Sequence, residues 1–148
     1  MHGENAEKVV LSSYRKKKAS AGLDQTIKIW EAARATSAAT SFFDPIIIGR
    51  FKQRFHDGAT GANNPVNLLW REALREFAGD DNVRLQAELQ CLISLGTGQP
   101  DEQEWTTKAT DVINRLKEFA TETATTATIF EDNHATLRDK HYFRFDPQ

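Results

Sequence analysis

The stretch Leu89-Gln90-Cys91-Leu92-Ile93-Ser94-Leu95 decides the fold class of this chain. It is a largely apolar run, and Gly96, Gly98 and Pro100 end it. A short apolar run bounded by glycines is typical of a strand that is buried on both faces of a parallel sheet. We therefore predict a central parallel strand in which Cys91 is a buried small hydrophobe rather than a nucleophile.

Helical and extended patterns alternate on both sides of this run. Apolar residues recur at spacings of three and four in segments that predict helices, at residues 26–37, 65–77 and onward from 105. Short apolar or aromatic runs predict further strands, at residues 9–11, 51–56 and 141–145. Whether the last helix continues through the threonines to Thr128 is left open, because threonine is a poor helix former. Trp30 and Trp70 lie on the apolar helical faces and are expected in the core.

Strands separated by helices imply parallel pairing and an α/β fold. We predict a three-layer sandwich with a mostly parallel central sheet. In such a sheet, catalytic and binding groups gather at the carboxyl ends of the strands.

Composition excludes several classes of function. The chain has 148 residues, a formal net charge of -2 and one cysteine. This charge gives no indication of nucleic-acid binding, and a single cysteine excludes an internal disulfide and a thiolate metal cluster. None of the four histidines pairs with another at metal-ligand spacing, so we expect no metal site and predict solvated or packing roles for all four. No run is long and apolar enough for a membrane span or a signal peptide, which favours an intracellular protein.

Two segments follow predicted strands and could carry chemistry. Asp57-Gly58-Ala59 places a carboxylate after the strand at 51–56, and Gly58 would let another group approach its backbone closely. The same residues are also typical of an ordinary Asx turn. Gly96-Thr97-Gly98 lacks the lysine and spacing of a phosphate-binding loop, so we interpret it as a plain loop.

Four segments together carry a resemblance to a known family, at residues 30–39 (WEAARATSAA), 42–45 (FFDP), 57–65 (DGATGANNP) and 93–98 (ISLGTG). In this order and spacing they resemble patatin-like phospholipases, especially fungal members. The resemblance implies a lipid acyl hydrolase that uses a Ser-Asp dyad on phospholipid or acylglycerol esters, without a cofactor. It also implies that Asp57 is the general base and that Gly58 and Ala59 complete the motif. Thr40 and Thr60 depart from residues common in the family.

The serine of that dyad is missing from this sequence. The family's nucleophile lies in a G-x-S-x-G elbow, and none of the six serines has glycine two residues before and two after. We therefore expect residues 1–148 to be the C-terminal half of such a domain and to be inactive alone. An incomplete sheet would also expose an edge that a missing N-terminal half or a partner would cover. The alternatives are a noncatalytic remnant, an interaction protein or a truncated gene model.

Overall fold

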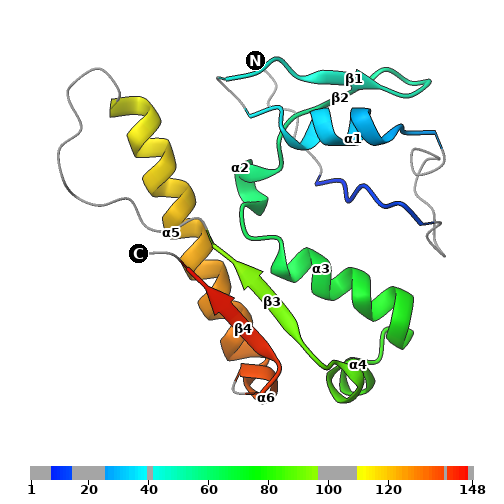
Figure 1. Ribbon diagram of the computed structural model, residues 1–148, viewed down its shortest axis with the longest axis vertical. Coiled ribbons are helices and arrows are strands. Elements are labelled where there is room, and N and C mark those ends of the chain that lie inside the picture. Colours follow the sequence, from blue (N-terminus) through cyan, green and yellow to red (C-terminus); the bar gives the residue numbers. More distant parts are fainter. Residues whose placement is uncertain (1–7, 15–25, 40–41, 97–109, 139, 147–148) are drawn as a thin grey trace. The chain divides into compact units, whose positions relative to one another are not determined.

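The computed structural model describes residues 8–14, 26–39, 42–96, 110–138 and 140–146 (Figure 1). The chain divides into two compact units, Met1–Ala62 and Asn63–Gln148. Each unit has a hydrophobic cluster of its own. The segment from residue 97, which is predicted to be a loop, lies outside the described residues.

The first unit is a helix beside a β-hairpin. Its elements are α1 (Ile29–Thr36), β1 (Ile46–Ile48), β2 (Gln53–Phe55) and α2 (Ala59–Ala62). Helix α1 begins where Glu31 Oε2 accepts a hydrogen bond from the Lys28 amide at 2.8 Å. Strands β1 and β2 pair antiparallel, with Ile46 opposite Phe55. The turn between them contains two residues with positive φ, Gly49 and Lys52, which reverse the chain.

The structure confirms two predictions for this unit and corrects three. A helix within 26–37 and a strand within 51–56 are both present. The strand pairs antiparallel rather than parallel, because the preceding Ile46–Ile48 run, which had not been predicted as a strand, folds back on it. Residues 9–11 form no strand, although Leu11 packs against the cluster around Ala35 and Ile48. Trp30 is 60% exposed and is not a core residue.

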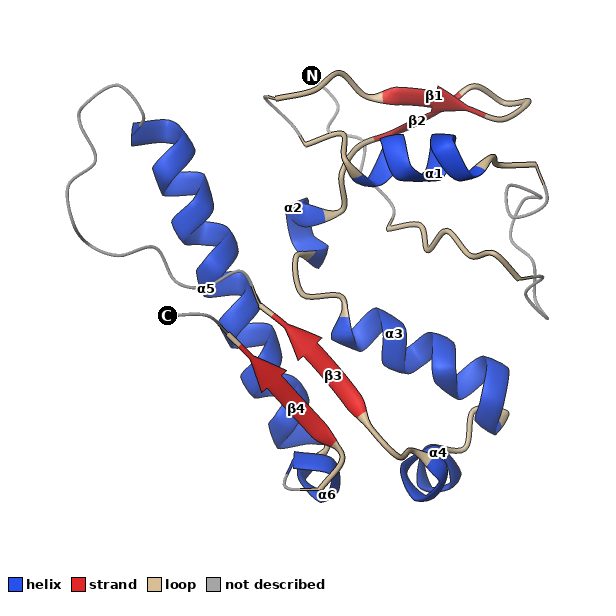
Figure 2. Ribbon diagram, in the orientation of Figure 1, coloured by secondary structure: helices blue, strands red, loops and turns tan. Residues whose placement is uncertain are grey.

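The second unit contains the remaining helices and a two-stranded parallel sheet (Figure 2). Its elements are α3 (Val66–Ala73), the π-helical turn η2 (Leu74–Ala78), α4 (Asn82–Glu88), β3 (Leu92–Leu95), α5 (Thr110–Asn133), α6 (Ala135–Arg138) and β4 (Tyr142–Phe145). Strands β3 and β4 are parallel, with Leu92 opposite Tyr142 and Leu95 opposite Phe145. The prediction of parallel pairing for these two strands is therefore confirmed.

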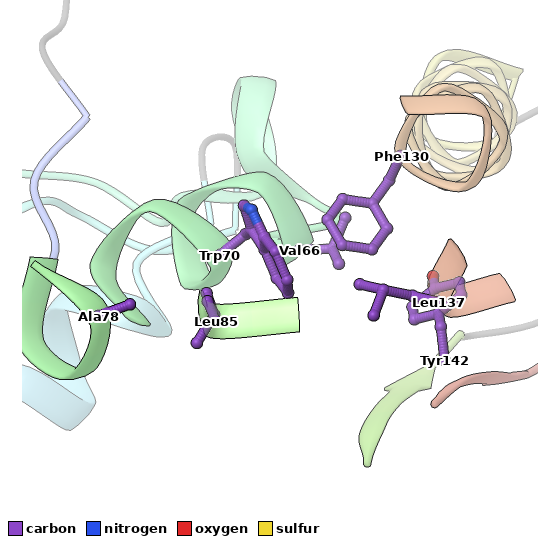
Figure 3. Packing of buried hydrophobic residues seen from close by; sticks show 7 residues of the cluster. All are labelled: Val66, Trp70, Ala78, Leu85, Phe130, Leu137 and Tyr142. Carbon is purple, nitrogen blue, oxygen red and sulfur yellow. The ribbon is translucent and has the colours of Figure 1, made fainter. Parts of the chain in front are cut away.

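An aromatic core joins α3, α5 and β4 in this unit (Figure 3). The rings of Trp70 and Phe130 meet edge to face, with centroids 5.8 Å apart. Phe130 is fully buried, and its ring also packs against the Tyr142 ring, with centroids 5.2 Å apart. His134 stacks on Phe130 at 4.3 Å, which confirms a packing role for this histidine. The prediction of Trp70 as a core residue is also confirmed, since it is 5% exposed.

The predicted central strand is correct in position but wrong in burial. Ile93 is 59% exposed and Leu95 is 78% exposed, whereas Leu92 packs against the core. Only one face of the β3–β4 pair is covered among the described residues, so this sheet is not buried on both faces. Cys91 precedes the strand and is exposed, which corrects its assignment as a buried hydrophobe.

Two helices also refine the sequence prediction. Helix α5 continues through the threonines as far as Asn133. Helix α4 was not predicted; Asp81 is its N-cap, and the carboxylate of Asp81 accepts hydrogen bonds from the amides of Val83 and Arg84. The α/β character is thus present, while the described strands form two separate pairs. The three-layer sandwich stays a prediction. No described helix has the length and hydropathy needed to cross a bilayer.

Candidate active site

Asp57 lies at the carboxyl end of strand β2, in the first unit, and is half-buried. Its amide donates a hydrogen bond to the carbonyl oxygen of Ala38 at 2.9 Å. Ala38 is fully buried just after helix α1, so its carbonyl is held in a fixed place. The backbone of Asp57 is therefore attached both to the hairpin and to the segment that leaves α1.

The carboxylate of Asp57 forms an Asx turn. Its Oδ1 accepts a hydrogen bond from the amide of Ala59 at 2.9 Å, and Gly58 lies in the bend between them. The carbonyl of Gly58 then accepts from the amide of Ala62, which closes the short helix α2. The hydrogen bond from the Ala59 amide occupies Oδ1 of Asp57 and fixes the orientation of the carboxylate. Because an Asx turn is also a common structural device, the turn alone does not establish catalysis.

Arg34 holds the segment between α1 and the hairpin. Its Nη2 donates to the carbonyl of Asp44 at 2.7 Å. Its guanidinium carbon also lies 5.6 Å from the centroid of the Phe43 ring, which suits a cation–π contact. These contacts attach residues 43–44 to helix α1, and the hairpin that starts two residues later leads to Asp57. Both contacts therefore help to hold the segment that leads to the hairpin.

Three of the described serines have ordinary hydrogen-bond partners. The hydroxyls of Ser12 and Ser37 donate to backbone carbonyls, those of Tyr14 and Ala33. Ser94 accepts a hydrogen bond from Arg144 Nη1 at 2.9 Å. An arginine cannot act as a base toward a serine, because its side chain stays protonated. These contacts give no sign of an activated serine among Ser12, Ser37 and Ser94.

The histidines show packing or exposed positions. His141 Nδ1 lies 3.0 Å from the carbonyl of Gln90, and His134 Nδ1 lies 2.9 Å from that of Phe130. His56 is exposed beside Asp57. Within the described ranges, no group of three or more histidine, cysteine, aspartate or glutamate side chains could hold a metal ion.

A polar network in the second unit was not predicted from the sequence. Asn63 Nδ2 donates to Thr123 Oγ1 at 2.6 Å, and Asn64 Nδ2 donates to the Thr123 carbonyl at 3.2 Å. Asn64 Oδ1 also accepts from the amide of Val66, the first residue of α3. The contact of Asn64 with Thr123, about sixty residues away in sequence, could not be read from local spacing.

The same residues line a cavity of about 130 Å³. Its walls come from the start of α3, strand β3, Thr123 of α5 and Arg144 of β4. The side chains that line it combine polar groups with the apolar surface of Val66 and Leu69. It lies wholly within the second unit.

Sequence comparison relates the chain to phospholipases. Calcium-independent phospholipase A2-gamma of Mus musculus is 31% identical to the chain over 124 residues. The human protein of the same name has the same identity over the same length. Phospholipase A I of Arabidopsis thaliana is 35% identical over 71 residues. These similarities support a patatin-like phospholipase family.

These matches cover a large share of this chain but a small share of each relative. The mouse match covers 81% of this chain but 14% of the mouse protein, and the Arabidopsis match covers 48% of this chain and 5% of the plant protein. The chain thus spans a small part of the length of these curated relatives. No family model matches the chain. No solved structure matches it either.

Proposed function

We propose that this chain is the aspartate-bearing part of a patatin-like lipid acyl hydrolase of fungal type, corresponding to the C-terminal half of the domain. Asp57 is the general base of a Ser-Asp dyad, and Asp57, Gly58 and Ala59 form its motif. The observation that carries the proposal is the position of Asp57: a carboxylate oriented by the Ala59 amide at the end of a strand. A preorganised carboxylate of this kind suits proton abstraction from an alcohol.

The second carboxylate oxygen is the group that would take the proton. One oxygen accepts the Ala59 amide, which stabilises the turn and sets the direction of the other oxygen. Gly58 has no atom within 4 Å of the place where a Cβ would stand. That open space supports the close approach of another group to this backbone.

The nucleophile has to come from residues other than these 148, because no serine lies in a G-x-S-x-G sequence. A general base without its nucleophile contributes little, since the members of such a pair act as a unit. We therefore propose that the 148 residues alone are inactive. The substrates of the complete enzyme are glycerophospholipid or acylglycerol esters, a proposal supported by the names of the similar proteins, which are phospholipases.

A chimera tests the proposal directly. The stretch of mouse calcium-independent phospholipase A2-gamma that matches this chain is replaced by the corresponding residues of this chain, and phospholipid hydrolysis is measured. We expect measurable activity, and we expect Asp57→Asn to lower kcat by roughly a thousandfold or more, because an amide cannot accept the proton.

Asp44→Asn is the matched control, since Asp44 lies in the same unit and is exposed. Its contact with Arg34 uses the backbone carbonyl, which the substitution leaves in place. An active chimera in which Asp57→Asn changes kcat no more than Asp44→Asn would overturn the assignment of the base.

A noncatalytic role is the competing function, and the absence of an elbow serine favours it. A fluorophosphonate probe, which reacts with activated serines, separates the two. We expect no labelling of the isolated chain, but labelling of the active chimera. Labelling of the isolated chain at one of its own serines would contradict the proposal that the nucleophile lies elsewhere.

A further inference from the structure

The inference concerns the turn of the β1–β2 hairpin in the first unit (Figure 1). The Lys52 amide donates a hydrogen bond to the Gly49 carbonyl at 3.1 Å, which closes a four-residue turn. Arg50 and Phe51 occupy the two central positions of this turn. The side chain of Phe51 is 77% exposed, so a large apolar group stands at the end of the hairpin.

Three cationic side chains accompany the Phe51 ring. Arg50 precedes it, Lys52 follows it and Arg54 lies in β2, and all three are exposed. The hairpin, residues 46–55, contains no aspartate or glutamate, so these three cations give it a charge of +3 within a chain of net charge -2. None of the three cations forms an ion pair with an acidic side chain of the described residues.

The outer face of the hairpin continues this combination of apolar and cationic groups. Neighbouring residues of a strand point to opposite faces, and residues that pair across an antiparallel ladder share a face. Ile48 is buried in a cluster with Ala35 of α1, so its face is the inner one. Ile47 and Arg54 pair across the ladder on the outer face, and both are exposed.

We propose that the hairpin turn binds an anionic membrane surface. The Phe51 ring enters the boundary between the headgroups and the acyl chains, while Arg50, Lys52 and Arg54 contact the lipid phosphates. Apolar side chains among cations suit this boundary, because the apolar layer of a bilayer lies directly beneath its charged headgroups. The proposal concerns attachment to lipid and does not depend on Asp57 being a general base.

The charges distinguish this hairpin from exposed aromatic residues elsewhere. Phe77 in the second unit is similarly exposed, at 71%, but it follows Glu76 directly in the sequence. Phe43 precedes Asp44 and already contacts the guanidinium of Arg34. An acidic protein surface could also attract cations, and the absence of vesicle binding would favour that partner over a membrane.

Flotation with lipid vesicles tests the proposal on the full 148-residue chain. One set of vesicles contains phosphatidylcholine alone, and the other contains equal parts of phosphatidylcholine and phosphatidylserine. We expect strong binding to the anionic vesicles and weak binding to the neutral ones. Binding to the anionic vesicles should weaken as salt is added, because salt screens the attraction between exposed charges.

Matched substitutions identify the surface that binds. Phe51→Ala and Phe77→Ala each remove one exposed ring, and Arg50→Gln and Arg71→Gln each remove one exposed cation. We expect Phe51→Ala to weaken binding to the anionic vesicles roughly tenfold or more, and Arg50→Gln to weaken it roughly fivefold. The controls at Phe77 and Arg71 should bind as the original chain does.

A fluorophore reports whether the turn itself enters the bilayer. Cys91→Ser removes the one cysteine of the sequence, and Phe51→Cys or Phe77→Cys then provides a single site for an environment-sensitive dye. The dye is apolar and takes the place of the ring, so we expect it to brighten on anionic vesicles at residue 51 but not at residue 77. This measurement decides the question even where Phe51→Ala fails to fold, as judged by circular dichroism.

Three results would each overturn the proposal. The first is a lack of binding to the anionic vesicles, and the second is equal binding to the neutral ones. The third is equal behaviour of the variants and dyes at residues 51 and 77, which would assign lipid binding to another surface of the chain.

Discussion

Two tryptophans with similar sequence surroundings have different environments. Trp70 is 5% exposed, contacts Phe130 and donates a hydrogen bond from Nε1 to Asn82 Oδ1 at 3.0 Å. Trp30 is 60% exposed on α1. Both follow a helical spacing, so periodicity predicted both as core residues. Periodicity identifies a face, but which face is covered depends on contacts with distant elements.

Replacing each tryptophan by alanine tests this difference. We expect Trp70→Ala to lower the free energy of unfolding by about 3–5 kcal/mol, because it removes a large buried side chain. Trp30→Ala should change it by no more than about 0.5 kcal/mol, as for other exposed positions. Urea denaturation followed by circular dichroism measures both. Equal losses for the two variants would contradict the burial described above.

Gly58 and Gly79 make a second residue-level comparison. Gly79 ends the π-helical turn with φ of 62°, a conformation that costs alanine about 1–2 kcal/mol. Gly58 has no positive φ and meets no atom within 4 Å at its Cβ position. We expect Gly79→Ala to lower the melting temperature of the chain and Gly58→Ala to leave it unchanged.

The open space at Gly58 also leads to a prediction for hydrolysis. If a reacting group approaches Gly58 closely, Gly58→Ala should reduce hydrolysis by the chimera while its stability stays the same. A chimera that remains fully active with Gly58→Ala would argue against close approach at this position.

At the scale of elements, Asp81 determines where α4 begins. Its Oδ1 accepts from the amides of Val83 and Arg84 at 3.0 and 3.1 Å. We expect Asp81→Ala to lower the free energy of unfolding by about 1 kcal/mol, and Asp81→Asn to lower it much less, because asparagine is an equally good cap. Chemical denaturation of both variants measures the difference. A similar loss in both would indicate that capping is not the cause.

The elements differ in how well local sequence specified them. The helices at α1, α3 and α5 and the strands β2, β3 and β4 follow apolar periodicity or clear breakers, and their positions could be predicted. The pairing of β2 could not, because it depends on a reversal at Gly49 and Lys52 that lets Ile46–Ile48 fold back. Helix α4 was missed because it is short and its main signal is the single cap at Asp81.

In the candidate site, too, local features could be predicted and contacts between distant segments could not. Asp57 and its turn could be predicted, since an Asp-Gly pair after a strand is a local pattern. The support from the Ala38 carbonyl, nineteen positions earlier, could not be. Neither could the contacts of Asn63 and Asn64 with Thr123, because hydrogen bonds between distant segments leave no regular spacing.

At the scale of the whole molecule, the exposed apolar residues of β3 and β4 should make the chain associate with itself. Sedimentation velocity should show larger species as concentration rises, and Leu95→Glu should reduce them by placing a charge on that face. Val83→Glu is the matched control, because Val83 is also 78% exposed but lies on α4. Equal effects of the two substitutions would show that added charge, not this face, controls association.

The hydrogen bond from the Asp57 amide to Ala38 also provides a way to observe the turn without any substrate. An amide bonded to a fully buried residue exchanges slowly with deuterium, whereas an amide open to water exchanges fast. In a nitrogen-15 spectrum, the exchange rate of this one proton would therefore report whether a substitution has disturbed the backbone of the proposed base. It would distinguish variants that have lost the carboxylate from variants that have lost its support.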